Sequence, residues 1–189
     1  KIDSINKKQA VVSVFEKVKN NNDPVLKITL FLGLVKNDSF SSITTRMSEL
    51  GVSAIVPFQC SRSGIKTTDV KVDKMQKVAN MAIKQCDMST PIKVHQVCSF
   101  ESMLQKLQQF DQGYFAYESQ GQAKTSFVPS GKNIAVVVGS IGGFDEQEAM
   151  RIAAQKNVKT VSLGKRIMRV ETACASLVAV LMQQSGEWE

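Results

Sequence analysis

The sequence predicts an α/β fold, with a mostly parallel sheet and helices on both of its faces. From residue 25 onward, short apolar runs alternate with longer segments of helical periodicity, a pattern typical of parallel βαβ units. The apolar runs are nearly continuous rather than alternating, as expected for strands buried on both sides. At 189 residues, the chain is long enough to bury a substantial core.

The N-terminal part follows a different pattern. Residues 10–18 (AVVSVFEKV) alternate between apolar and polar side chains and predict a half-buried strand. Residues 20–24 (NNNDP) predict a loop. The strand resembles the end of a small β domain, so the predicted boundary lies near Asp23, with residues 1–23 and 24–189 as the two parts.

The remaining elements are predicted from the alternation just described. Strands are expected at residues 25–35, 52–58, 93–97, 113–117, 134–139 and 160–164. Helices are expected at residues 39–50, 73–86, 99–110, 145–156 and 170–184. A polar loop is expected at residues 118–132, between the fourth and fifth of these strands.

The charge balance favours a polyanionic partner. The 24 Lys and Arg residues exceed the 17 Asp and Glu residues, for a formal net charge of +7, and RNA is the commonest partner of such a protein. Aromatic residues make up only 6% of the chain, which argues against a stacking platform for single-stranded bases.

Composition also argues against a membrane segment and a metal site. No apolar run approaches the roughly 20 residues of a membrane-spanning helix, and the start, KIDSINKKQA, lacks the apolar core of a signal peptide. The four cysteines are widely spaced, and the chain has one histidine. We therefore expect no membrane partner, a cytoplasmic location, reduced thiols and no bound metal.

The stretch VVVGSIGGFDEQEAMRIA, residues 136–153, joins a buried strand to a helix through three glycines. Asp145 can cap that helix, with Glu146 and Glu148 in its first turn. The order G-S-I-G-G-F is not the dinucleotide fingerprint G-x-G-x-x-G, and no G-K-[ST] follows. The turn either lets backbone groups approach a ligand or is simply a tight connection.

A second strand-to-glycine turn follows in VSLGKRIMRVETACASLVAV, residues 161–180. A basic and apolar linker leads from Gly164 to a helix rich in small residues. Two such turns in one sheet can together form a pocket in which a flat apolar ligand is held by backbone hydrogen bonds. A side chain added at Gly142 is then expected to enter the space of the ligand.

The pair GSIGGF and LGKRIMRVETA resembles the C-terminal motifs of the ribosomal small-subunit RNA methyltransferase E family, of the SPOUT or trefoil-knot class. Upstream, SELGVSAIVPFQCSRS (residues 48–63) and KMQKVANMAIKQC through TPIKV (residues 74–94) are also similar to that family. The resemblance covers about residues 25–183.

The resemblance implies an enzyme that uses S-adenosylmethionine to methylate N3 of a uridine in 16S rRNA, free or in the small ribosomal subunit. It implies a trefoil knot over about residues 134–181 and a homodimer formed through the helix at residues 171–184. Residues 1–23 would be the end of an N-terminal PUA-like β domain.

The site residues implied by the resemblance fall into three groups. The catalytic group is Arg166, Arg169 and Glu171. The RNA-binding group is Arg62 and Lys165. The cofactor-binding group is Tyr117, Gly139, Ile141, Gly142, Gly143, Leu163, Gly164, Ile167, Met168, Thr172 and Ala173.

Four positions depart from the family pattern. Ser140 and Ile141 stand where the family has Pro and Glu, and Lys84 and Met88 stand where it has Glu and Arg. Two alternatives therefore remain open. One is a catalytically weakened or inactive homologue that still binds RNA. The other is a small-molecule α/β enzyme that uses the same end of the sheet.

Overall fold

A seven-stranded sheet forms the centre of the molecule. The structure, a computed structural model, describes residues 1–18, 22–117 and 126–188. The strand order is β5-β4-β3-β8-β7-β9, every neighbouring pair is parallel, and β6 pairs with the end of β4. These strands are β3 (Lys27–Gly33), β4 (Ala54–Gln59), β5 (Lys93–Val94), β6 (Cys98–Ser99), β7 (Gln112–Ala116), β8 (Asn133–Val138) and β9 (Val158–Val161).

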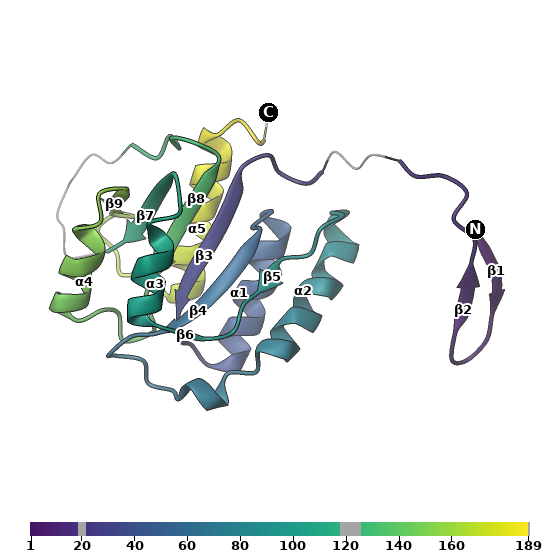
Figure 1. The fold of residues 1–189 in the computed structure, drawn as a ribbon, viewed down its shortest axis with the longest axis horizontal. Coiled ribbons are helices and arrows are strands. Elements are labelled where there is room, and N and C mark those ends of the chain that lie inside the picture. The colour runs from purple at the N-terminus through teal and green to yellow at the C-terminus, as the bar shows by residue number, and fades with distance from the viewer. Residues whose placement is uncertain (19–21, 118–125, 189) are drawn as a thin grey trace.

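Helices cover both faces of this sheet, as Figure 1 shows. One apolar cluster lies under α1, α2 and α5, and a second lies under α3 and α4. The helices are α1 (Asn37–Glu49), α2 (Val72–Cys86), α3 (Phe100–Leu107), α4 (Glu146–Ala153) and α5 (Val170–Gln184), with a short 3-10 turn at Thr67–Asp69. The predicted α/β class with a mostly parallel sheet is confirmed.

The two clusters explain why the central strands read as continuous apolar runs. In β8, Val136 points into the cluster under α1, α2 and α5, whereas Ala135 and Val137 point into the other. In β3, Leu30 and Phe31 divide in the same way. Successive side chains of a strand face opposite sides, so a strand covered on both sides needs apolar residues at every position.

Two predicted strands are shorter or displaced. The strand expected at residues 93–97 ends at Val94, and pairing with β4 resumes only at β6. Val94 pairs with Ile55 of β4, and Cys98 pairs with Phe58. The segment from β5 to β6 therefore contains one residue more than the facing part of β4, and this extra residue interrupts the ladder as a β-bulge does. The strand expected at residues 160–164 is β9, at Val158–Val161. The Gly164 N–H donates to the Ser162 hydroxyl at 3.2 Å, and such local bonds compete with strand pairing.

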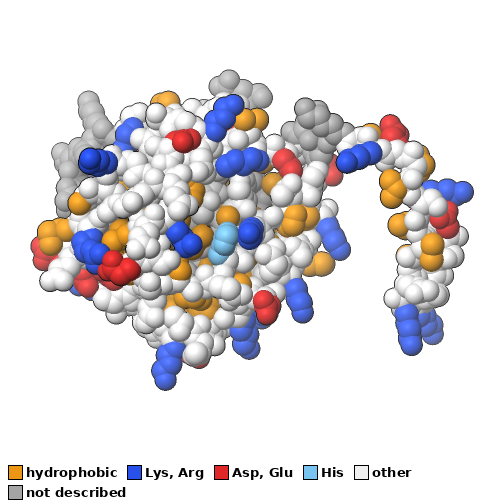
Figure 2. Space-filling model, viewed as in Figure 1, with side chains coloured by type: hydrophobic (Ala, Val, Ile, Leu, Met, Phe, Trp, Pro, Cys, Tyr) orange, Lys and Arg blue, Asp and Glu red, His pale blue; other side chains and the backbone are white. Residues whose placement is uncertain are grey.

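The N-terminal prediction was wrong in extent and in burial. An antiparallel hairpin joins β1 (Ile2–Ile5) to β2 (Ala10–Val12), and every residue of both strands is exposed (Figure 2). In this hairpin Ile2 pairs with Val12, and the Ser13 N–H donates to the Lys1 carbonyl. Residues 14–18 pair with no described residue and do not form a strand. The division at Asp23 and the PUA-like β domain stay predictions.

In the described ranges, no helix has both the length and the apolar character needed to cross a bilayer.

Candidate functional site

The predicted site residues lie along one edge of the sheet, where the parallel strands end. Residues 139–143, called here the glycine turn, follow β8, and residues 162–169, called the basic turn, follow β9. Tyr117 follows β7, and residues 60–63, called the Arg62 turn, follow β4. Ligands of open parallel sheets bind in the crevice outside this edge.

The glycine turn is tight and lies close to its neighbours. Ser140 and Gly143 form an antiparallel bridge, with the Gly143 N–H donating to the Ser140 carbonyl at 2.9 Å. Gly143 has a φ of 69°, which favours glycine. A Cβ on Gly33, at the end of β3, would lie 2.3 Å from the Ser140 nitrogen, so this approach also requires glycine. At the tip of the turn, Ile141 is 68% exposed.

The Arg62 turn is packed against the glycine turn. The Ser140 hydroxyl donates to the Arg62 carbonyl at 3.1 Å, and the Cys60 thiol donates to the Gly143 carbonyl at 3.8 Å. A Cβ on Gly142 would lie 2.8 Å from the Arg62 carbonyl oxygen. A side chain at Gly142 was expected to enter the space of a ligand. This expectation is wrong for its Cβ atom, because the Arg62 backbone already occupies the space toward which that atom would point.

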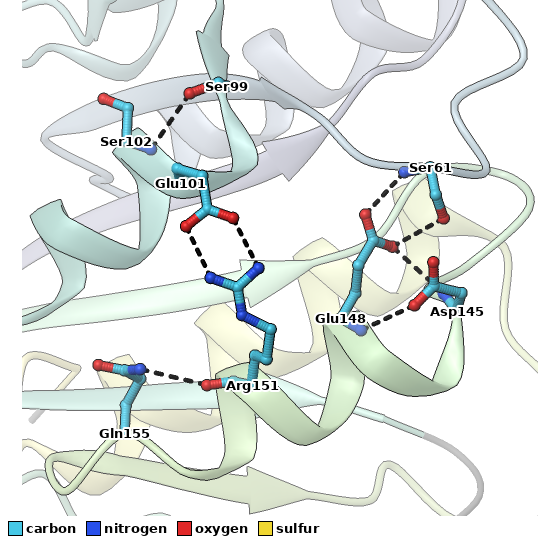
Figure 3. A network of polar contacts seen from close by, with 8 residues as sticks. All are labelled: Ser61, Ser99, Glu101, Ser102, Asp145, Glu148, Arg151 and Gln155. Atoms are coloured by element: carbon cyan, nitrogen blue, oxygen red, sulfur yellow. Dashed lines mark hydrogen bonds and ion pairs between the residues drawn. The ribbon is translucent and has the colours of Figure 1, made fainter.

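The start of α4 is joined to the same turn through one carboxylate (Figure 3). Glu148, 8% exposed, accepts from the Ser61 N–H at 2.7 Å and from the Ser61 hydroxyl at 3.1 Å. It also accepts from the Asp145 N–H at 3.2 Å, while the Asp145 carboxylate accepts from the Glu148 N–H at 2.7 Å. This reciprocal pair is a capping box.

The electrostatics of the α4 cap follow from these contacts. The pKa of Asp145 is lowered, first by the Glu148 N–H, then by the Ser61 hydroxyl, with a smaller contribution from the Arg62 guanidinium. To the left of the cap in Figure 3, the two terminal guanidinium nitrogens of Arg151, Nη1 and Nη2, each donate to the Glu101 carboxylate at 2.6 Å. This exposed pair links α4 to α3.

The basic turn presents charged and apolar side chains to solvent. Lys165, Arg166 and Arg169 are exposed, and Ile167 is 83% exposed. Gly164 has a φ of 107°. Leu163 packs against the core, and Met168 is half-buried. The turn is thus anchored at its start, with a basic, partly apolar outer surface.

Glu171 lies where α5 meets α1. The pKa of Glu171 is lowered mainly by a hydrogen bond from the Ser39 hydroxyl, at the start of α1. The Arg169 and Arg46 guanidinium groups lower it further. The carboxylate therefore faces a neighbouring helix and two cations. This environment supports a role in holding the start of α5, and the catalytic role stays a prediction.

The other predicted cofactor residues lie near the same edge. The Tyr117 N–H donates to the Val161 carbonyl at 3.1 Å, and its ring stacks on Phe115 with centroids 5.3 Å apart. Thr172 is exposed, whereas Ala173 packs against the core. The predicted loop at residues 118–132 begins directly after Tyr117, and its residues 118–125 lie outside the described part.

Two of the four family departures lie far from this edge. Lys84 and Met88 are at the end of α2, which runs back toward the amino ends of the strands. The neighbouring Ser89 N–H donates to Asp23, just before β3. Ser140 and Ile141, in contrast, belong to the glycine turn, so only these two bear directly on the site.

Sequence reasoning did not identify the roles of Glu148 and Ser61. The spacing of Asp145 and Glu148 contains the signal of a capping box, but its link to the Arg62 turn has no local signal, since Ser61 and Glu148 are 87 positions apart. Among the described residues, no three His, Cys, Asp or Glu side chains gather as a metal site. The edge thus offers backbone groups, apolar side chains and cations.

Comparisons with known proteins identify the family. The model of the RNA methyltransferase domain family matches residues 21–182. The ribosomal RNA small subunit methyltransferase E of Bacillus subtilis is 33% identical, over 97% of this chain and 76% of that protein. The protein of the same name from Mesomycoplasma hyopneumoniae is 26% identical, over 87% of this chain and 73% of its own length.

Solved structures agree with this match. The ribosomal RNA small subunit methyltransferase E of Neisseria gonorrhoeae, bound to S-adenosyl methionine, superposes with a TM-score of 0.78 at 27% identity, covering 87% of this chain and 68% of that chain. A methyltransferase of Legionella pneumophila, at 21% identity, shares the fold with a TM-score of 0.86, over 97% of this chain and 77% of its own. The family match spans the Arg62, glycine and basic turns, and the chain therefore belongs to the RNA methyltransferase domain family.

Proposed function

We propose that this protein transfers a methyl group from S-adenosylmethionine to the RNA of the small ribosomal subunit. The observation that carries the proposal is the contact between the glycine turn and the Arg62 turn, at the same end of the sheet at which the basic turn follows β9. The names of the relatives and the S-adenosyl methionine bound to the Neisseria gonorrhoeae protein support it.

The geometry of the two glycine-containing turns fits this cofactor. A Cβ on Gly143 or Gly164 would meet no atom within 4 Å, so the backbone there is open to a ligand. Ile141 and Ile167 add exposed apolar side chains that suit the flat adenine. S-adenosylmethionine supplies a methyl group on a sulfonium with a good leaving group. The remaining task of the protein is to bind, orient and exclude water.

The exposed cations supply the RNA-binding part of the proposal. Arg62, Lys165, Arg166 and Arg169 can pair with phosphate groups, and such pairing dominates the affinity of proteins for nucleic acids. For a uridine acceptor, N3 is weakly acidic. A guanidinium from Arg166 or Arg169 near it would favour the deprotonated, nucleophilic form. Glu171, close to Arg169, would orient that side chain.

The proposal extends to the partners and the location. The substrate would be 16S rRNA, free or in the small ribosomal subunit, and the protein would act in the cytoplasm. Two copies of the chain would form a homodimer through α5.

The first test is methylation of small-subunit particles by the wild-type protein and by Arg166→Ala and Arg169→Ala, with nucleoside analysis of the product. We expect 3-methyluridine from the wild type and less from each variant. Calorimetric titration with S-adenosylhomocysteine is the accompanying measurement. Absence of binding would contradict the proposed function.

The inactive RNA-binding homologue is the second candidate, and Ile141 is the observation that favours it. An exposed apolar side chain stands at the tip of the glycine turn, where the family has a carboxylate. Binding of both RNA and S-adenosylhomocysteine without any methyl transfer would support this candidate over the active enzyme.

A further inference from the structure

The Arg62 turn is held from two directions. On one side, the Ser140 hydroxyl and the closely packed Gly142 of the glycine turn meet the Arg62 carbonyl. On the other, the Glu148 carboxylate of α4 accepts from both the N–H and the hydroxyl of Ser61. The backbone of the turn is thus fixed, while the Arg62 side chain is exposed.

The contacts of Glu148 exceed what capping needs. A capping box needs only the two reciprocal hydrogen bonds between Asp145 and Glu148. Glu148 makes two further hydrogen bonds, to a turn that follows a different strand. Hydrogen bonds to an ionised carboxylate are stronger than neutral ones, particularly when the group is shielded from water. Glu148 is such a shielded group, being 8% exposed.

The positions of Glu148 and Ser61 along the chain also connect the glycine turn to the Arg62 turn. Glu148 begins the helix that directly follows the glycine turn, and Ser61 directly precedes Arg62. Glu148 therefore connects the helix that follows the glycine turn to the turn that carries Arg62. Ser140 adds a second link, which the proline found in the family at that position could not provide, because proline has no hydroxyl group.

We propose that Glu148 is a positioning residue for RNA binding, which holds the Arg62 turn against the glycine turn so that Arg62 lies beside the methyl-donor site. This inference rests on the proposed function. Occupancy of the glycine turn by the cofactor and contact of Arg62 with an RNA phosphate are then coupled, and each strengthens the other.

A double-mutant cycle tests the proposal. The wild-type protein, Glu148→Ala, Arg62→Ala and the double variant are compared in their affinity for a 16S rRNA transcript, with and without saturating S-adenosylhomocysteine. Glu146→Ala, an exposed carboxylate in the same helical turn, is the matched control. Thermal melts report folding for every variant.

We expect Glu148→Ala to weaken RNA binding on the order of tenfold, as for the loss of charge-assisted contacts. In the Arg62→Ala background the same change should have little further effect, because residues acting through one another are not additive. S-adenosylhomocysteine should strengthen RNA binding by the wild type and by Glu146→Ala, and this gain should be lost in Glu148→Ala.

Milder variants keep the test decisive if Glu148→Ala fails to fold. Ser61→Ala removes only the hydroxyl bond, and Glu148→Gln keeps one acceptor, so both should show smaller losses in the same direction. Additive effects of the Glu148 and Arg62 changes, or unchanged RNA affinity in the folded variants, would overturn the inference while leaving the proposed function intact. A wild-type protein that does not bind S-adenosylhomocysteine would instead contradict the proposed function.

Discussion

Gly142 and Gly143 are adjacent, but replacing them should have different consequences. Gly142→Val is expected to destabilise the fold by about 1–3 kcal/mol, because the new side chain meets the Arg62 carbonyl. Gly143→Ala meets no atom but must adopt a positive φ, at a cost of about 1–2 kcal/mol. Denaturant unfolding measures both values.

Calorimetry with S-adenosylhomocysteine then separates fold from function at these two positions. If the glycine turn binds the cofactor, Gly143→Ala should lose affinity for S-adenosylhomocysteine. The added methyl group would point into open space, which the ligand would then occupy. Unchanged affinity in a folded Gly143→Ala variant would mean that the turn serves only to connect β8 to α4.

Ile141→Glu restores the carboxylate of the family at the tip of the glycine turn. Since Ile141 is 68% exposed, the free energy of unfolding should change by no more than about 0.5 kcal/mol. Methylation of small-subunit particles should rise if the missing carboxylate limits the rate. A folded variant with no gain in methylation would assign the weakness, if any, to another residue.

At the residue level, the sequence motifs indicated which residues follow the ends of strands but not how those residues contact one another. The motifs placed Arg62, Gly142 and Arg166 correctly at the ends of strands. The contact between Ser140 and the Arg62 carbonyl joins residues 78 positions apart, and no local pattern encodes it. For the same reason, the hydrogen bonds between Glu148 and Ser61 could be found only in the structure.

At the scale of single elements, the cap of α4 predicts a pH dependence. The folded pKa of Asp145 lies below its ordinary value of 3.8, so the carboxylate contributes stability that is present above pH 3.8 and lost as the pH falls through the folded pKa. The difference in melting temperature between the wild type and Asp145→Asn should therefore shrink below about pH 4. Glu146→Gln is the control, and a difference that persisted in acid would contradict the assignment.

The surface of α5 bears on the proposed homodimer. Much of its apolar surface is already buried against α1 and β8 in the protomer, but Val180 is 36% exposed. Val180→Glu is expected to convert a dimer to a monomer in analytical ultracentrifugation, because an interface would bury the new charge. Met150→Glu, at an exposed apolar position on α4, should leave the oligomeric state unchanged. A wild-type protein that is monomeric at micromolar concentration would contradict the dimer.

The elements show which patterns can be read from sequence. Both ends of α5 agree with the expected residues 170–184, because its neighbours are a basic linker and a glycine. The strand β1 was missed, since KIDSI carries no clear apolar alternation. The break between β5 and β6 was missed because a bulge depends on the register with β4, which lies far away in the chain.

For the whole molecule, the knot is the remaining prediction. The chain leaves β9 at one border of the sheet and returns to α5, which packs on β8 and α1. The family resemblance predicts a trefoil knot over about residues 134–181. A crystallographic trace of the whole chain tests this. Threading is rare among proteins in general, and an unknotted trace would contradict the prediction.

The pairing of β3 with β8 has a consequence for how the chain is made. Lys27 of β3 pairs with Asn133 of β8. The central strand β3 is therefore synthesised more than a hundred residues before the strand with which it pairs. Contacts this distant slow folding, because the intervening chain must be ordered before they form. Until β8 is synthesised, β3 has an unpaired edge in the nascent chain. We expect the chain to be most prone to aggregate in this incompletely formed state of the sheet.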